Sequence, residues 1–207
     1  MLADQAIPGA SGTQARPVVR AKTPTDIALL TRMASGDTLA MQAFYARHNV
    51  RVFRFVLRIV ADHGVAEDVI SETFLDAWRQ ADRFEGRSAA STWLLAIARH
   101  KAYAALRRRS NMTALTEEVT DQIEDCADTP DTTVEKDARG RILRRCLDEL
   151  TPAHREIIDL VYYHEKSLAE VAQIVAIPEN TVKTRLFYAR KRLSTLARNA
   201  GIDRDWL

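Results

Sequence analysis

Apolar side chains recur every three or four positions along most of this chain, which is the period of an amphipathic α-helix. Gly, Pro and helix-capping residues interrupt the pattern and divide it into segments. Ser35-Gly36-Asp37 is one break, with Asp37 as the expected N-cap of the next helix, and Asp62-His63-Gly64 is another. No segment alternates between apolar and polar residues for long enough to indicate a strand. The first half is therefore predicted to form helices at about residues 26–34, 38–60, 66–80 and 91–109. The expected fold class is all-α.

A second set of helices is predicted to begin near Ala138. Thr151 followed by Pro152 is typical of a helix start, with Thr as the N-cap and Pro in the first helical position. Ser167 and Glu170 have the spacing of a capping box, in which each side chain satisfies the other's backbone amide. At least two further helices are therefore expected in the second half.

Two stretches lack any helical period. Residues 1–24 mix Ala, Gly, Pro and Ser, and we expect a disordered tail there. Residues 111–137 are acidic and aperiodic, which is typical of a flexible linker. The sequence thus predicts two small domains, an N-terminal helical bundle at 25–110 and a C-terminal domain at 138–207.

The charge distribution supports this division. The chain has a net charge of only +2, but residues 1–110 carry 16 basic and 10 acidic side chains, for a net +6. Residues 111–137 have a net charge of −8, and residues 138–207 have +4. Two basic domains flanking an acidic segment suggest two surfaces that face nucleic acid.

Other features argue against several classes of protein. Cys126 and Cys146 have neither a CxxC spacing nor a His at metal-ligand spacing, so we expect free thiols and no metal or cofactor. No apolar run approaches the roughly 20 residues that cross a bilayer, and the first residues do not resemble a secretion signal. A cytoplasmic protein without membrane insertion is expected.

Residues 167–193 have the pattern of a helix-turn-helix. A helix at 167–175 is followed by a turn at 176–178 and a second helix, whose apolar positions form one stripe: Val182, Leu186, Ala189 and Leu193. Its remaining surface is polar and basic, with Asn180, Thr181, Lys183, Thr184, Arg185, Tyr188, Arg190, Lys191 and Arg192. Such a helix can read bases in the major groove and bind phosphates. The alternative is a helical hairpin with a solvated basic face.

Two further surfaces are predicted in the N-terminal domain. Asp68, Glu72 and Asp76 stack beside Leu75 on one helix face, and no Lys or Arg within residues 66–78 neutralises them. This acidic stripe could dock a basic partner or could simply be solvated. On the next helix Trp93, His100 and Arg107 are seven residues apart, with Tyr103 between them. Aromatic and basic residues together suit single-stranded nucleic acid, whereas the alternative is packing of Trp93 and Tyr103 against a neighbouring helix.

The segments "AEDVISETFLDAW", "RFEGRSAASTWLLAIARHKAY" and "LTPAHREIIDLVYYHEKSLAEVAQIVAIPENTVKTRLFYARKRL" resemble the bacterial RNA polymerase sigma factors of the extracytoplasmic-function (ECF) group. The resemblance covers about residues 25–110 and 138–197. It departs from the usual pattern at Ala90, at His100, and at Ala176 and the Glu165-Lys166 corner, where Gly is frequent.

The resemblance implies a transcription initiation factor without enzyme activity, whose partners are core RNA polymerase, promoter DNA and an anti-sigma factor. Core docking would use Asp68, Glu72, Leu75 and Trp78. The melted minus-ten element would be bound by Arg87, Ser88, Trp93, His100, Tyr103 and Arg107, and the helix at 178–192 would read the minus-thirty-five duplex. Two alternatives remain, a sigma-like decoy that captures an anti-sigma factor and an ordinary helix-turn-helix repressor. An enzyme is disfavoured, because "HEKSL" has Leu168 where a zinc protease needs its second His.

Overall fold

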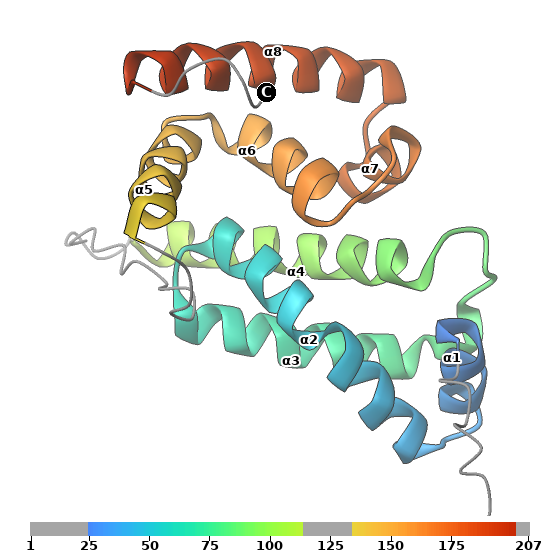
Figure 1. Ribbon diagram of the computed structural model, residues 1–207. Helices are drawn as coiled ribbons and strands as arrows, with labels where there is room; N and C mark the ends of the chain where they lie inside the picture. Colours follow the sequence, from blue (N-terminus) through green and yellow to red (C-terminus); the bar gives the residue numbers. More distant parts are fainter. Residues whose placement is uncertain (1–24, 114–133, 202–207) are drawn as a thin grey trace, which may run out of the picture.

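A computed structural model describes residues 25–113 and 134–201, and throughout these residues the chain is helical apart from short connections. The expected all-α fold of two small helical domains is confirmed in the described part of the chain (Figure 1). The N-terminal domain consists of α1 (Asp26–Ala34), α2 (Thr38–Val60), α3 (His63–Arg79), the 3₁₀ turn η1 (Ala81–Arg83) and α4 (Ala90–Thr113). The C-terminal domain consists of α5 (Val134–Asp148), α6 (Pro152–Ile158), the π-helical turn η2 (Asp159–Tyr163), α7 (Leu168–Val175) and α8 (Glu179–Asn199).

The core of the N-terminal domain lies where α2, α3 and α4 pack together, with α1 against α2. Phe44 of α2 meets Phe74 of α3 edge to face at 6.3 Å, and Leu94 of α4 is fully buried. The predicted capping residue Asp37 accepts hydrogen bonds from the backbone N–H groups of Leu39 and Ala40, so it fixes the start of α2.

The start of α3 differs from the prediction. Residues 62–64 were expected to break the chain, with a helix from about residue 66, but α3 already begins at His63. The break lies one residue earlier, because Ala61 ends α2 in the left-handed conformation at φ 52°. Asp62 then caps α3 by accepting the backbone N–H of Val65 at 3.0 Å. Gly64 is therefore tolerated inside the first helical turn.

The ends of the predicted linker are also helical. α4 continues to Thr113 and α5 begins at Val134, so helix extends into residues 111–137 from both sides. The rest of that segment, which holds most of its acidic residues, lies outside the described residues. The predicted N-terminal tail at 1–24 lies outside them as well.

The helix caps of the C-terminal domain were predicted from the sequence, but one of its elements was not. Thr151 caps α6, and Ser167 and Glu170 form the complete capping box at the start of α7. Arg155 ties α6 to the end of α5 by donating to the carbonyl groups of Leu147, Asp148 and Leu150. The π-helical turn η2 was not predicted, since single π turns carry little sequence signal.

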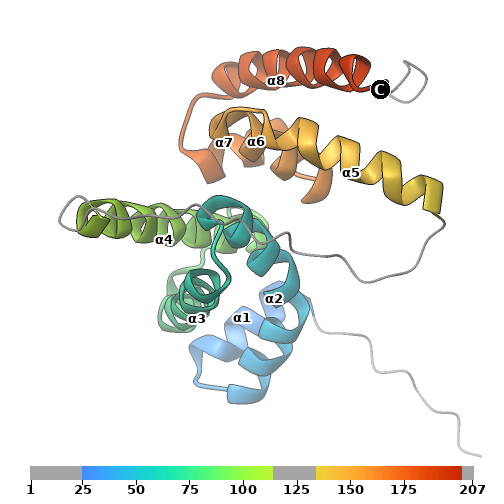
Figure 2. The same ribbon diagram turned by 90° about the vertical axis from the view of Figure 1, so that its left-hand side faces the viewer.

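The two domains are stacked in layers. Both ribbon views show α8 outermost, α6 and α7 beneath it, and then α4 with the rest of the N-terminal domain (Figures 1 and 2). α7 contacts both α8 and α4. None of the described helices has the length and apolar character needed to span a bilayer.

Candidate nucleic-acid interface

The outer helix α8 presents the predicted recognition surface. Its apolar stripe is buried as expected, with Val182 and Ala189 fully inaccessible and Leu186 and Leu193 7% exposed. The turn before it contains Ala176 in the left-handed conformation at φ 55° and Pro178 as the residue before the first helical position. This turn sets α8 across α7 and leaves the opposite side of α8 open to a partner.

All nine predicted recognition residues lie on α8 and outside its buried stripe. Thr181 and Arg185 are half-buried, and the others are exposed. The hydroxyl of Thr184 donates to the carbonyl of Asn180 at 3.0 Å, and Lys183 pairs with Glu179 at 3.1 Å. The guanidinium of Arg190 lies over the ring of Tyr162 and donates to its hydroxyl group, so it is held in place. The result is a polar and basic face with donors along its length.

Sequence reasoning missed one residue on this face. Phe187 is 62% exposed and its ring lies 5.4 Å from that of its neighbour Tyr188. Position 187 falls outside the buried stripe, so its outward direction could have been deduced from the helical period alone. An exposed aromatic ring in a major groove can contact the methyl group of thymine, which adds an apolar element to an otherwise polar surface.

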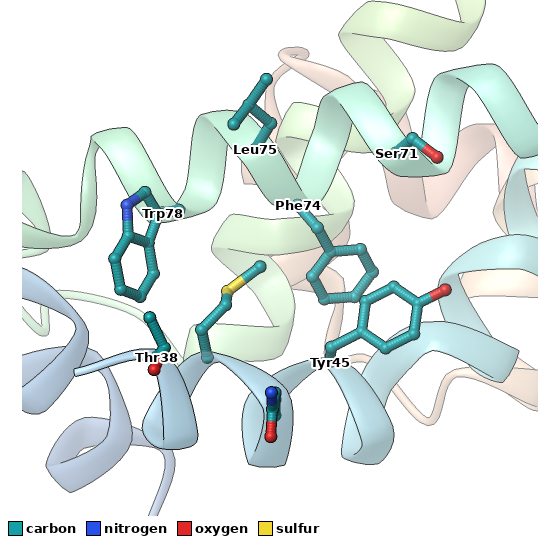
Figure 3. Close-up of a pocket in the computed structure, with 8 residues that line it drawn as sticks. Thr38, Tyr45, Ser71, Phe74, Leu75 and Trp78 are labelled. Atoms are coloured by element: carbon teal, nitrogen blue, oxygen red, sulfur yellow. The ribbon is translucent and has the colours of Figure 1, made fainter. Parts of the chain in front are cut away.

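A second candidate surface is an apolar groove of about 450 Å³ between α2 and α3. Phe74 and Trp78 point from α3 toward Tyr45 and Thr38 of α2, and Leu75 lies at the rim (Figure 3). Leu75 is 46% exposed and Tyr45 is 42% exposed, so apolar atoms are open to a partner here. Of the predicted docking residues, Leu75 and Trp78 line this groove.

The acidic stripe of Asp68, Glu72 and Asp76 beside the groove is partly neutralised by a cation from another helix. This corrects the interpretation made from the sequence. Lys101 reaches from α4 to Asp76 at 2.7 Å and to Glu72 at 3.4 Å. Burial alone would lower the pKa of Lys101, but the two carboxylates outweigh it and raise the pKa. Asp68 is exposed on the same helix. The sequence pattern within α3 could not reveal the pairing, because its cation lies on another helix.

The third surface is the beginning of α4 with the loop before it. Arg87 and Ser88 lie in this loop, where Arg87 pairs with Glu85 at 2.8 Å and Gly86 has φ 70°. Trp93 is half-buried, with its ring 5.2 Å from that of Phe84, whereas His100 and Arg107 are exposed.

Tyr103 is separated from this set. It is half-buried, and the guanidinium of Arg99 lies 4.7 Å from the centre of its ring. Burial raises the pKa of its hydroxyl group, and the negative charge of Glu156 raises it further. The packing alternative is thus partly realised, since Trp93 contacts Phe84 and Tyr103 contacts Arg99.

Comparisons with known proteins agree with this arrangement. Residues 44–112 match the family Sigma-70 region 2, and residues 140–193 match the family Sigma-70, region 4. The chain is 32% identical over 175 residues to the ECF RNA polymerase sigma factor SigK of Mycobacterium bovis (strain BCG / Pasteur 1173P2), covering 80% of this chain and 90% of that protein. It is 30% identical over 183 residues to the ECF RNA polymerase sigma factor SigL of Mycobacterium tuberculosis (strain ATCC 35801 / TMC 107 / Erdman), covering 86% of this chain and all of that protein.

A solved structure is also similar. The sigma factor RpoE of Bartonella quintana, in complex with the anti-sigma factor NepR, superposes with a TM-score of 0.64 at 26% identity. The superposition covers 77% of this chain and 96% of that one. The similarity therefore extends over both domains rather than over the helix-turn-helix alone.

Proposed function

The chain belongs to the ECF group of bacterial RNA polymerase sigma factors, which bind core polymerase and direct it to promoters, and we propose which of its surfaces binds polymerase and which bind promoter DNA. The observation that carries the proposal is the combination of two sigma regions in order, one with an open apolar groove and one with an exposed basic recognition helix. The residue assignments below are our proposal.

Core polymerase docks on the groove between α2 and α3. Leu75 and Trp78 supply apolar area, and Asp68 supplies a negative charge at the edge that steers a basic partner. Glu72 contributes less than its charge suggests, because Lys101 already pairs with it. A partner that approaches this face should therefore be apolar at its centre and basic at its rim.

The promoter is bound by two separate surfaces. The loop with Arg87 and Ser88, together with Trp93, His100, Tyr103 and Arg107 on α4, takes the melted minus-ten strand, because rings stack on unpaired bases and cations bind phosphates. The face of α8 takes the minus-thirty-five duplex, where Asn180, Thr181, Thr184, Arg185 and Tyr188 are close to its first turns and reach base edges. Lys183, Arg190, Lys191 and Arg192 bind phosphates.

We infer that an anti-sigma factor regulates this protein, because the similar sigma factor RpoE forms a complex with the anti-sigma factor NepR. We assign no catalytic reaction to the chain, since polymerase itself makes the RNA. Its action on polymerase and chromosomal promoters places it in the cytoplasm.

The test is in vitro transcription with purified core polymerase on a library of promoters. The proposal expects initiation from a subset of promoters that share two elements, and loss of this initiation in Arg185→Ala. Duplex binding without any association with core polymerase would instead indicate a repressor. Binding of an anti-sigma factor without core binding or transcription would indicate a decoy. Either result would overturn the proposed function.

A further inference from the structure

Tyr162 lies in the π-helical turn η2 and belongs to none of the three surfaces described above. The backbone N–H of His164 bonds to the carbonyl of Asp159, five residues earlier, at 3.0 Å, so this turn is one residue wider than a turn of α-helix. Leu160 in the same turn is fully buried, whereas Tyr162 is 55% exposed. Single π turns are frequent at functional sites, so the exposed ring was searched for a role.

The ring of Tyr162 holds a cation of the recognition helix. Nε of Arg190 donates to the Tyr162 hydroxyl group, and the guanidinium carbon lies 5.3 Å from the centre of the ring. The hydrogen bond fixes one edge of the guanidinium group, and the cation–π contact fixes its height over the ring. Arg190 is therefore oriented before any partner binds, although it is exposed to solvent.

The remaining donors of Arg190 are open. A guanidinium group has five N–H donors, and the bond to Tyr162 uses only the one on Nε. Within residues 25–113 and 134–201 no polar partner of Nη1 or Nη2 is found. The four N–H groups on these two atoms can bind two oxygens of one phosphate group, which is the geometry that Arg favours.

The position of Arg190 on α8 is suited to a phosphate contact. Arg190 follows the buried Ala189, so it lies on a flank of the helix, between the buried stripe and the outward face. A helix with its side chains is about 10–12 Å across and the major groove is about 12 Å wide, so the flanks meet the phosphates of the groove walls. Lys183 follows Val182 in the same way and lies on the same flank, about 10 Å away along the axis.

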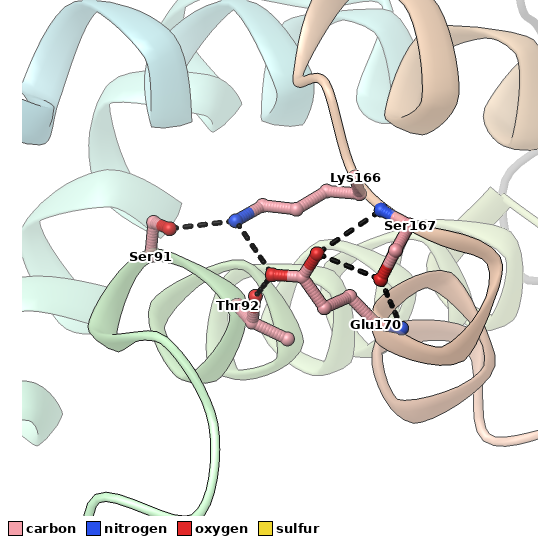
Figure 4. Close-up of polar contacts among 5 residues, drawn as sticks. All are labelled: Ser91, Thr92, Lys166, Ser167 and Glu170. Atoms are coloured by element: carbon pink, nitrogen blue, oxygen red, sulfur yellow. Dashed lines mark hydrogen bonds and ion pairs between the residues drawn. The ribbon is translucent and has the colours of Figure 1, made fainter.

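Other polar side chains close to η2 point away from α8. Lys166 donates to Oγ of Ser91 on α4 at 2.6 Å and lies 3.3 Å from Oε1 of Glu170 (Figure 4). Thr92 donates to the same carboxylate oxygen at 2.6 Å. These contacts face the N-terminal domain and do not involve Tyr162, so a substitution of Tyr162 leaves them in place.

We propose that Tyr162 is a positioning residue for DNA binding, which holds Arg190 in the orientation that binds a phosphate group on one wall of the major groove. Ordering a long side chain on association lowers affinity about two- to tenfold, and this cost is avoided where the side chain is already ordered. The inference rests on the proposed function of α8. It extends the DNA-binding apparatus to a residue that lies outside the helix-turn-helix.

The test is a double-mutant cycle on the full-length protein, with binding to a labelled minus-thirty-five duplex measured by fluorescence anisotropy. Arg190→Ala should weaken binding about tenfold, because a charge-assisted hydrogen bond is lost. Tyr162→Ala should weaken it about fivefold, and Tyr162→Phe, which keeps the ring, about twofold. Tyr162→Ala combined with Arg190→Ala should bind no more weakly than Arg190→Ala alone, because Tyr162 acts only through Arg190.

Two controls separate this role from general support of α8. Lys191 is exposed on the same helix and has no printed contact with Tyr162, so Lys191→Ala and Tyr162→Ala should weaken binding independently when combined. Arg190→Ala should also reduce the slope of log affinity against log salt concentration by about one, and its loss should be equal on a scrambled duplex. Thermal unfolding followed by circular dichroism checks that each variant is folded at the assay temperature.

Unchanged affinity in Tyr162→Ala would overturn the inference. So would a full effect of Tyr162→Ala when Arg190 is already replaced, or an equally strong coupling to Lys191, because Tyr162 would then contact DNA itself or support the whole helix. A loss in Arg190→Ala confined to the minus-thirty-five duplex would assign Arg190 to a base and overturn it as well. Promoter-dependent transcription by wild-type holoenzyme tests the proposed function separately, and coupling on the scrambled duplex can be measured whether or not transcription is found.

Discussion

His164, at the end of η2, should make this protein less stable in mild acid. Its side chain is 2% exposed and its ring packs edge to face against Phe55 of α2 at 5.4 Å. Burial lowers its pKa to about 4, and the positive charges of Arg58, Arg51 and Lys166 lower it in the same direction. Asp159 lies 3.5 Å away and would favour a charged imidazole, but its carboxylate is already paired with Arg58.

The direction of this pH dependence follows from comparing how the folded and unfolded states bind a proton at His164. The unfolded chain has an ordinary imidazole with a pKa of 6.5, so it takes up a proton below pH 6.5, whereas the folded protein does so only near pH 4. Stability is therefore lost as pH falls through this window. At pH 5 the loss from this one group is about 2 kcal/mol. Burial also lowers the pKa of His48, which acts in the same direction.

The assay is urea unfolding followed by circular dichroism between pH 7 and pH 5, in the wild type and in His164→Gln. We expect the free energy of unfolding of the wild type to fall by about 2 kcal/mol over this range, and the variant to lose most of that dependence. Glu170 interferes little, since the carboxylate in the unfolded chain, with its ordinary pKa of 4.5, is mostly ionised above pH 5. His100→Gln is the control, because His100 is exposed. Equal pH dependence in the wild type and His164→Gln would refute the reasoning.

Four further predictions address the other surfaces. Asp68→Lys should weaken core polymerase binding by several kcal/mol through repulsion of a basic partner, and unchanged holoenzyme formation by size-exclusion chromatography would contradict the docking assignment. Arg185→Ala should cost about 1–3 kcal/mol on the cognate minus-thirty-five duplex, and an equal loss on scrambled duplex would assign Arg185 to phosphate instead. Trp93→Ala should impair initiation on duplex templates and be rescued by a pre-melted bubble, because stacking is available only on unpaired bases; similar defects on both templates would make Trp93 a packing residue. Ala176→Gly should raise stability by about 1 kcal/mol in thermal unfolding, since Ala176 has a positive φ that Gly adopts at lower cost, and no gain would mean that the turn carries no strain.

The structure changes one experiment that the sequence alone would suggest. Reversing the charges of both Asp68 and Glu72 tests the acidic stripe as a unit, but Glu72 pairs with Lys101. Glu72→Lys would place two cations together and disturb the packing of α3 on α4. Asp68→Lys alone therefore reports on docking more cleanly.

Much of this protein was determined by local sequence. The helical periods, the caps at Asp37, Thr151 and Ser167, and the buried stripe of α8 were all predicted and are present, because each depends on residues within one or two turns of each other. The sequence motifs also indicated the sigma family, and the matches to Sigma-70 region 2 and Sigma-70, region 4 confirm it.

The tertiary structure alone decided what these helices face. Lys101 neutralises acidic residues about 25 to 29 positions earlier, and Thr92 binds Glu170 across 78 residues of sequence. No pattern in the sequence predicts either of these pairings. Pairing between helices depends on how their apolar faces pack and on the direction in which each polar side chain then points. The apolar groove between α2 and α3, the cover over Tyr103 and the contacts of Glu156 and Glu170 with α4 arise in the same way. A local pattern predicts which side chains leave the core of a helix, and only the packing of the whole chain determines which of them remain open to a partner.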